Sequence, residues 1–239
     1  MAMQAGSPAR AAGALGWKAW LQERQYATAY HWRQAPNDER EYRLRTDVVL
    51  RLAHLAGPER PAARPRLLDV GCGDARFTAD ATLRAHVVGV DVSRRALGHA
   101  RDLAPLAHFA ASSGGALPFP SNSFDVVTIL DVIEHIPDVD ERRVVAEAHR
   151  VLRPGGRLVI STNTDRSACE LKHYRHYSIA RFRSLFAGLE RLELAGIIPY
   201  FPTLKMWMAT PLLWRLTASR IRTCAAEEAH VVVGAATKP

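Results

Sequence analysis

The sequence has few cysteines and no paired-cysteine motif. The 239 residues contain three of them, Cys72, Cys169 and Cys224, and no two form a Cys-x-x-Cys pair. This spacing indicates neither a disulfide framework nor a zinc-thiolate site. A run of about 18 consecutive apolar residues, the length needed to span a bilayer, is also missing. The sequence therefore predicts no transmembrane helix.

A dense block of lysine and arginine is missing too, although basic residues exceed acidic ones by 32 to 24. Scattered arginines are more typical of a generally basic surface than of a nucleic-acid groove, so we expect no nucleic-acid partner. The net charge of +8 remains compatible with an acidic substrate or an anionic lipid surface. Because no charged start precedes an apolar stretch, we expect no secretion signal and a cytoplasmic protein.

The most informative stretch joins an apolar run to a glycine-rich turn. Residues 67–70 are typical of the end of a buried parallel strand, and a helix can begin near residue 75. Between them, Gly71 and Gly73 let the backbone turn tightly and approach a ligand closely. A strand, a glycine turn and a helix start together predict a nucleotide-binding loop. The dinucleotide fingerprint would require a third glycine at Arg76, so NAD is disfavoured.

A second carboxylate follows where such a fold would place one. The apolar run 87–90 ends in Asp91, about 20 residues after Asp69. A carboxylate at the end of the second strand accepts hydrogen bonds from both hydroxyls of a bound ribose. Asp91 is therefore expected to bind the ribose of a nucleoside cofactor.

Four motifs in order carry a resemblance to a known family. They occupy residues 69–73, 89–91, 117–127 and 151–156. Together they resemble the motifs of class I S-adenosylmethionine-dependent methyltransferases, and the resemblance covers roughly residues 40–239. The alternative for the glycine loop taken alone is some other Rossmann-like domain.

The alternation of apolar strands and helices predicts an α/β fold. We expect a Rossmann-like, doubly wound, mostly parallel seven-stranded sheet with helices on both faces and an antiparallel last strand. The expected strands lie near 67–70, 86–91, 107–111, 125–131, 156–161, 189–198 and 229–236. The expected helices between them lie near 75–84, 94–103, 140–151 and 178–187.

The N-terminal region is expected to differ from the rest of the chain. Residues 1–14 are rich in alanine and glycine and predict a disordered tail. Residues 15–60 predict a helical cap, with one helix over 17–34 and another over 38–55 that Asp38 caps. The cap either packs on the core or covers the substrate as a lid. Residues 61–239 are expected to form the methyltransferase domain.

The resemblance implies S-adenosylmethionine as cofactor and assigns residues to its parts. Asp69, Gly71 and Gly73, with Cys72 in the same loop, would surround the methionine part. Asp91 would hold the ribose.

The resemblance also implies contacts with the adenine and the methyl group. Val92 would flank the adenine, and Asp131 would pass beside the transferred methyl. Many relatives carry an acid for the adenine amino group where Ser113 stands here, in a stretch that also holds Gly114 and Leu117. A serine hydroxyl can still accept one hydrogen bond.

An acid and histidine stretch follows the fourth expected strand. Asp131, Glu134 and His135 resemble a stretch of ubiquinone-pathway O-methyltransferases and small-RNA 3′-terminal methyltransferases, in which two acids and a histidine can hold a divalent metal. His173 or His176 would then be a fourth ligand. The alternative is that Glu134 and His135 cap the next helix and the distal histidines contact substrate. We expect no metal.

His135 and His176 are the candidates for a general base, because histidine titrates near neutral pH. A polar residue that only orients its loop is the alternative for His176. The apolar segment 200–215 has three alternatives, which are core packing, binding of an apolar acceptor, or peripheral contact with a membrane surface.

The sequence as a whole predicts a methyltransferase that acts on a small, apolar or aromatic metabolite, with O-methylation favoured. Two alternatives stay open. One is an RNA methyltransferase, and the other is a scaffold protein that binds S-adenosylmethionine without catalysis.

Overall fold

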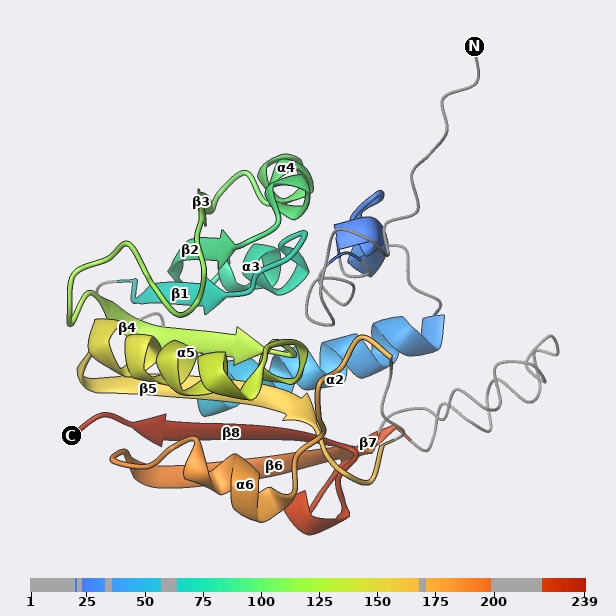
Figure 1. The fold of residues 1–239 in the computed structure, drawn as a ribbon, viewed down its shortest axis with the longest axis vertical. Helices are drawn as coiled ribbons and strands as arrows, with labels where there is room; N and C mark the ends of the chain where they lie inside the picture. Colours follow the sequence, from blue (N-terminus) through green and yellow to red (C-terminus); the bar gives the residue numbers. More distant parts are fainter. Residues whose placement is uncertain (1–19, 21–22, 33–35, 57–63, 168–170, 199–220) are drawn as a thin grey trace, which may run out of the picture.

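An eight-stranded sheet forms the centre of the computed structural model (Figure 1), which describes residues 20, 23–32, 36–56, 64–167, 171–198 and 221–239. The strand order is β3-β2-β1-β4-β5-β8-β6-β7. The strands are β1 (Arg66–Val70), β2 (His86–Asp91), β3 (His108–Ala111), β4 (Phe124–Leu130), β5 (Leu152–Asn163), β6 (Glu190–Ile198), β7 (Arg222–Cys224) and β8 (Val231–Thr237). The predicted α/β Rossmann-like fold is confirmed.

Pairing within the sheet agrees with most of the expected pattern. Strands β1 to β5 pair in parallel, and β8 runs antiparallel between β5 and β6. The antiparallel last strand is therefore confirmed, but the count of seven strands is wrong by one. The additional strand is β7, which pairs antiparallel with the end of β6 at the edge of the sheet. The three residues of β7 are partly exposed and show no hydrophobic alternation. The formation of β7 therefore depends on pairing with β6 rather than on its own sequence.

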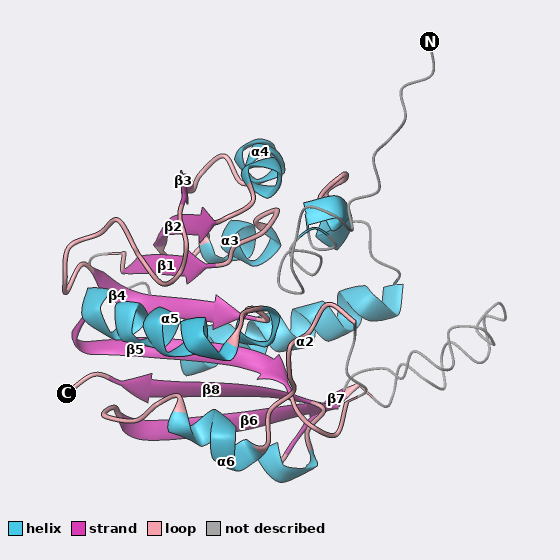
Figure 2. Ribbon diagram, in the orientation of Figure 1, coloured by secondary structure: helices cyan, strands magenta, loops and turns pink. Residues whose placement is uncertain are grey.

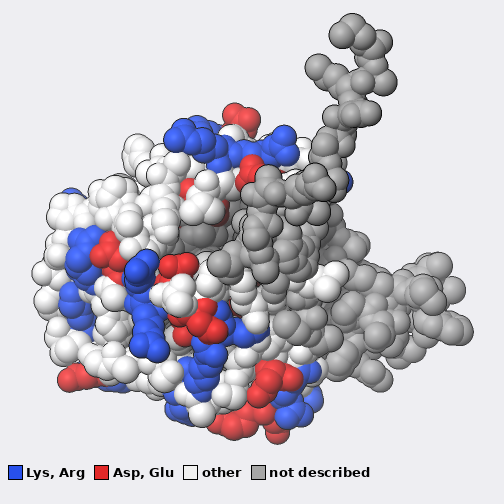
Figure 3. Space-filling view, in the orientation of Figure 1, with Lys and Arg blue, Asp and Glu red and all other residues white. Residues whose placement is uncertain are grey.

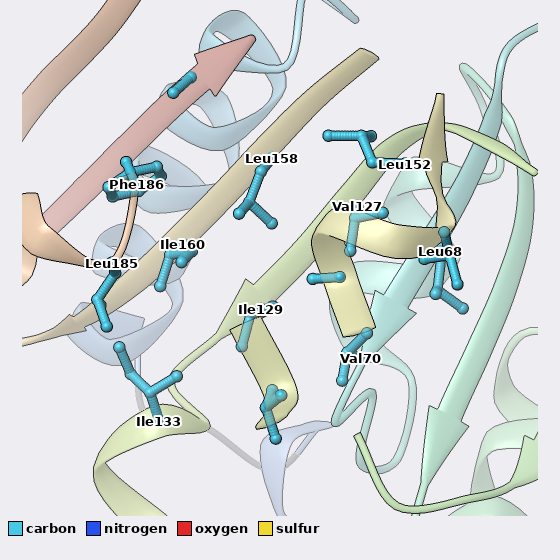
Figure 4. Packing of buried hydrophobic residues seen from close by; sticks show 14 of the residues in the cluster. Leu68, Val70, Val127, Ile129, Ile133, Leu152, Leu158, Ile160, Leu185 and Phe186 are labelled. Atoms are coloured by element: carbon cyan, nitrogen blue, oxygen red, sulfur yellow. The ribbon is translucent and has the colours of Figure 1, made fainter. Parts of the chain in front are cut away.

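Helices cover both faces of the sheet (Figure 2). They are α2 (Pro36–Leu52), α3 (Arg76–Ala81), α4 (Arg94–Leu103), α5 (Asp138–Val151) and α6 (Ile179–Ser184). On one face α5 and α6 pack on Leu68, Ile129 and Ile160, as Figure 4 shows for the strand residues. On the other face α2 and α3 pack on Leu67, Val126 and other buried strand residues. Burying both faces explains why these strands are nearly continuous apolar runs.

The predicted cap differs from the structure in detail. Residues 26 and 27 form a turn, and a 3-10 helix η2 (Tyr30–Trp32) follows, so a continuous helix over 17–34 is wrong. The backbone N–H of His31 donates to Asp74 instead of to a helical carbonyl, so a tertiary contact overrides local propensity here. Helix α2 begins at Pro36, two residues before the predicted cap Asp38. The tail 1–14 and the apolar segment 200–215 lie outside the described residues.

Charged side chains of both signs lie side by side on the face over α5 and α6 (Figure 3). Glu147 pairs with Arg150 at 2.6 Å, and Asp138 pairs with Arg181 at 2.6 Å. Within the part of the chain that the structure describes, no helix is both long and apolar enough to cross a membrane.

Candidate cofactor and acceptor site

A cleft of about 270 Å³ opens at the carboxyl ends of β1, β2 and β4, the edge where open α/β sheets bind ligands. Most residues predicted from the sequence line it, namely Asp69, Gly71, Cys72, Gly73, Asp91, Val92, Ser113, Gly114, Asp131 and His135. Two predicted residues do not line it. The Leu117 side chain is 6% exposed and packs in the core, and His176 contacts another histidine instead.

The glycine loop has a backbone shape that other residues rarely adopt. Gly71 has φ 75° and Gly73 has φ 54°, both in the left-handed region. The amides of Gly71 and Cys72 donate to the Val90 carbonyl at 2.7 and 3.0 Å, which fixes the loop against β2. A Cβ atom at Gly73 would lie 2.6 Å from the Tyr26 hydroxyl. The loop therefore forms a tight cradle at the edge of the cleft.

Asp91 braces this loop and keeps acceptor capacity for a ligand. Its two carboxylate oxygens accept from the backbone amides of Gly73 at 2.9 Å and Ser93 at 2.8 Å. Each carboxylate oxygen has two lone pairs, so one on each oxygen stays available for a ribose hydroxyl. Burial raises the pKa of Asp91, and the backbone amides of Ser93, Gly73 and Val92 oppose that shift. Asp91 thus remains a candidate acceptor for the ribose hydroxyls that the sequence predicts it to bind.

Asp69 supports the cleft through two hydroxyl groups that the sequence analysis missed. Thr78 donates to one carboxylate oxygen at 2.6 Å, and Thr128 donates to the other at 2.8 Å. Burial raises the pKa of Asp69 to about 6, against the effect of both hydroxyls. Asp69 thus ties β1 to α3 and β4 at the point where the loop begins.

The residues expected beside the adenine form another part of the cleft wall. Val92 is 73% exposed, and the Ser113 hydroxyl accepts from the Gly115 amide at 3.2 Å. A Cβ atom at Gly114 would lie 2.9 Å from Val70, so this wall also needs a glycine. The Leu117 amide donates to Glu147 at 2.7 Å, which anchors the end of the stretch.

The N-terminal cap closes part of the cleft, a contribution that the sequence analysis gave only as one of two alternatives. The His31 ring lies 2.7 Å from Asp74, and the Trp32 indole donates to the Asp74 carbonyl at 3.0 Å. Tyr26 and Tyr30 also line the cleft. The high aromatic content of residues 17–34 is the feature of the sequence that could have indicated this contact between the cap and the cleft.

Asp131 and Arg45 form an ion pair, and both residues line the cleft. Asp131 has φ 54°, an unusual conformation for a residue other than glycine. Its second oxygen accepts from the Ser161 hydroxyl at 3.0 Å. Arg45 is not among the residues predicted from the sequence, although its spacing from Val49 on α2 places it on the inward face of that helix.

Glu134, His135 and His173 form a cluster beside Asp131, in which Glu134 and His173 are buried and His135 is partly exposed. Their ligand atoms lie within 4.8 Å of one another. Burial, with a contribution from Asp131, raises the pKa of Glu134 to about 8. Burial, with a contribution from His173, lowers the pKa of His135 to about 4. His176 contacts the cluster through His173, because its Nε2 lies 2.8 Å from His173 Nδ1. The Nδ1 atom of His176 lies 3.0 Å from the Ser167 carbonyl oxygen.

Carboxylate and imidazole groups can hold Mn²⁺ or Zn²⁺, but we predict that this cluster works without a metal. Burial raises the pKa of Glu134, which disfavours the ionised carboxylate that a metal would need, and Thr162 donates to it at 2.9 Å. We expect unchanged methyl transfer after treatment with EDTA, and no rise of the melting temperature when Mn²⁺ or Zn²⁺ is added to stripped protein. Lost activity that a divalent ion restores would contradict this prediction.

Comparisons with known proteins agree with this geometry. Residues 68–160 match the family model of a methyltransferase domain. Relatives include a ubiquinone biosynthesis O-methyltransferase of Aromatoleum aromaticum (36% identity, 50% of each chain) and a demethylmenaquinone methyltransferase of Tropheryma whipplei (31% identity, 66% of each chain). The chain thus spans about half the length of the first of these relatives, and about two thirds of the second.

A solved structure extends the likeness to the whole fold. The N-methyltransferase NodS from Bradyrhizobium japonicum, in complex with S-adenosyl-L-homocysteine, aligns with a TM-score of 0.68. The alignment covers 93% of this chain and 98% of NodS at 18% identity. The fold, the domain match and the relatives agree with one another and with S-adenosylmethionine as cofactor. The chain belongs to the class I S-adenosylmethionine-dependent methyltransferases.

Proposed function

We propose that this protein transfers a methyl group from S-adenosylmethionine to a small-molecule acceptor, with oxygen as the favoured acceptor atom. The observation that carries the proposal is the brace between Asp91 and the Gly73 amide at the rim of the cleft. This hydrogen bond leaves lone pairs on the Asp91 carboxylate for a ribose, next to the glycine loop. The same cleft is also lined by Asp131 and His135. The cofactor supplies a methyl group that is already activated on a sulfonium.

The residues of this chain then have three tasks. The glycine loop binds the methionine part of the cofactor, Asp91 binds its ribose, and the N-terminal cap excludes water through Tyr26 and Tyr30. Asp131 and His135 line the end of the cleft that is left for an acceptor. Most of the rate enhancement would come from aligning acceptor and methyl, because the entropy of that alignment is already spent on binding.

The acceptor is proposed to carry an apolar or aromatic ring. Tyr30, Tyr42, Val49 and Ile136 contribute aromatic and aliphatic surface to the cleft. Among the relatives, the names ubiquinone biosynthesis O-methyltransferase and 27-O-demethylrifamycin SV methyltransferase indicate oxygen as the acceptor atom in those proteins. Both observations support O-methylation of a small metabolite here.

His135 is proposed as the residue that accepts the acceptor proton, and this role predicts a pH profile. Because its pKa lies near 4, the imidazole is neutral at pH 7 and its Nδ1 has no partner among the described residues. We therefore expect kcat to show no His135 inflection between pH 6 and 8 and to fall only as the pH approaches 4. His135→Asn should lower kcat by about 100-fold.

His108→Asn serves as the matched control for this prediction, because His108 is exposed at the start of β3. It should leave kcat unchanged. An inflection near pH 6.5 that disappears in His135→Asn would contradict the low pKa. We propose that His176 orients His173 rather than the acceptor, so His176→Asn should have a smaller effect than His135→Asn.

The proposed reaction is tested by isotope transfer. The purified chain is incubated with S-adenosylmethionine carrying a deuterated methyl group and with pooled metabolites, or in parallel with pooled RNA. We expect a labelled small molecule in mass spectra and an equal amount of S-adenosylhomocysteine. Label in RNA alone, or bound cofactor without turnover, would contradict the proposal.

A further inference from the structure

Arg45 occupies a position on α2 where an apolar residue would be expected. Val48, Val49 and Leu52 follow it by three, four and seven residues, and all three are buried against the sheet. Residues with this spacing share one face of a helix. A cation on such a face loses hydration, which is unfavourable unless a specific partner or ligand compensates. The Arg45 side chain is only 24% exposed and lines the cleft.

The partner of Arg45 is itself held in an unfavourable conformation. Asp131 has φ 54° directly after β4, and its amide donates to the Ser161 carbonyl at 3.0 Å. Strained residues of this kind persist where the surrounding structure enforces them, and they are frequent at functional sites. A desolvated cation and a strained acid therefore meet at the acceptor end of the cleft.

Arg45 differs from the other arginine of the cleft in its unused hydrogen-bond donors. Arg76 donates to the His31 carbonyl and to Glu39, and its guanidinium lies 4.0 Å from the centre of the Tyr42 ring. Arg45 donates to Asp131, and its distance to Glu41, 4.0 Å, is too long for a hydrogen bond. A guanidinium carries five N–H donors in a planar fork, so Arg45 retains donors that can reach the cleft.

Arg45 lies beside two acids, since Glu41 is 4.0 Å away in addition to Asp131, so these three side chains carry one net negative charge. Hydrogen-bond donors that Arg45 retains, and not a net positive charge, are therefore what an acceptor oxygen can use. Resting on the proposed function, we propose that Arg45 binds an anionic oxygen of the acceptor, so that the acceptor class is acidic. The anionic oxygen is that of a carboxylate or of an ionised hydroxyl, and in the second case the acceptor brings no proton for His135 to accept. Guanidinium groups recognise such oxygens through paired hydrogen bonds.

Binding of simple probes tests this inference without knowledge of the natural acceptor. The full chain, saturated with S-adenosylhomocysteine, is titrated with 4-hydroxybenzoate, with ionised 4-nitrophenol and with neutral 4-hydroxybenzamide. We expect at least one of the two anions to bind about tenfold or more tightly than the amide. A preference for 4-hydroxybenzoate assigns a carboxylate, and a preference for 4-nitrophenol assigns an ionised hydroxyl.

Arg45→Gln should abolish the preference for the anion, and Arg45→Lys should reduce it, since lysine keeps the charge but not the fork. Arg43→Gln is the matched control on the same helix, because Arg43 is 76% exposed and pairs with Glu39, and it should keep the preference. The dissociation constant for S-adenosylhomocysteine reports whether each variant is folded.

Two results would overturn the inference. One is wild-type protein that binds neither anion more tightly than the amide. The other is an unchanged preference in folded Arg45→Gln or Arg45→Lys. Failure of the wild type to bind S-adenosylhomocysteine at all would instead overturn the proposed function, so the two failures are distinguishable.

Discussion

Gly71→Ala is expected to weaken S-adenosylmethionine binding by at least about 30-fold, equivalent to about 2 kcal/mol. Gly71 has φ 75°, a conformation that costs any other residue about 1–2 kcal/mol. An alanine Cβ would also overlap the Val132 side chain, and such overpacking costs about 1–3 kcal/mol. The loop would have to move, and its movement would displace the cradle from Asp91.

The structure changes the reason for this expectation. The sequence suggests that a side chain at Gly71 would enter the space of the ligand, whereas the nearest atoms belong to Val132, next to Asp131. The effect is therefore expected on loop shape, so the melting temperature should be measured together with affinity.

Gly98→Ala is the matched control for Gly71→Ala. Gly98 lies within α4, and a Cβ atom there would meet nothing within 4 Å. Alanine is a better helix former than glycine, so this variant should gain about 0.5–1 kcal/mol in stability and keep its cofactor affinity. Gly71→Ala protein with wild-type affinity and wild-type melting temperature would contradict the assigned loop geometry.

Asp91→Ala is expected to weaken S-adenosylmethionine binding by about 100-fold or more. A hydrogen bond to a charged group contributes about 1.5–3 kcal/mol, and the carboxylate offers a free lone pair to each of two ribose hydroxyls. The variant also leaves the Gly73 amide without its acceptor, which loosens the cradle. Asp102→Ala is the matched control, because Asp102 is an exposed acid near the last turn of α4.

A comparison of two nucleosides separates ribose binding from loop support. Wild-type protein should bind adenosine more tightly than 2′-deoxyadenosine, because the second nucleoside lacks one of the hydroxyls. Asp91→Ala should bind the two equally. If the variant kept the wild-type preference, Asp91 would have only the structural role of holding Gly73 and Ser93.

The parts of the site that the sequence predicts are those encoded locally. Gly71, Gly73 and Asp91 follow apolar runs at fixed distances, and a strand that ends in a glycine turn has few alternative structures. Residues 69–73 and 89–91 therefore lie side by side at the carboxyl edge of β1 and β2 as the pattern predicts.

The parts that the sequence does not predict depend on contacts between distant segments. Arg45 lies 86 residues before Asp131, and nothing in α2 alone indicates that a strained acid faces it. The break of the first predicted helix likewise depends on Asp74, which binds both His31 and Trp32. The motif position of Leu117 also did not indicate that its side chain packs in the core.

Calorimetric titration of S-adenosylmethionine into the wild-type chain and into Asp91→Ala tests the central claim most directly. We predict one saturable site per chain in the wild type, weakened by about 100-fold or more in Asp91→Ala and unchanged in Asp102→Ala. A titration of folded wild-type protein that shows no binding, or equal affinity in Asp91→Ala, would contradict the cofactor site described above.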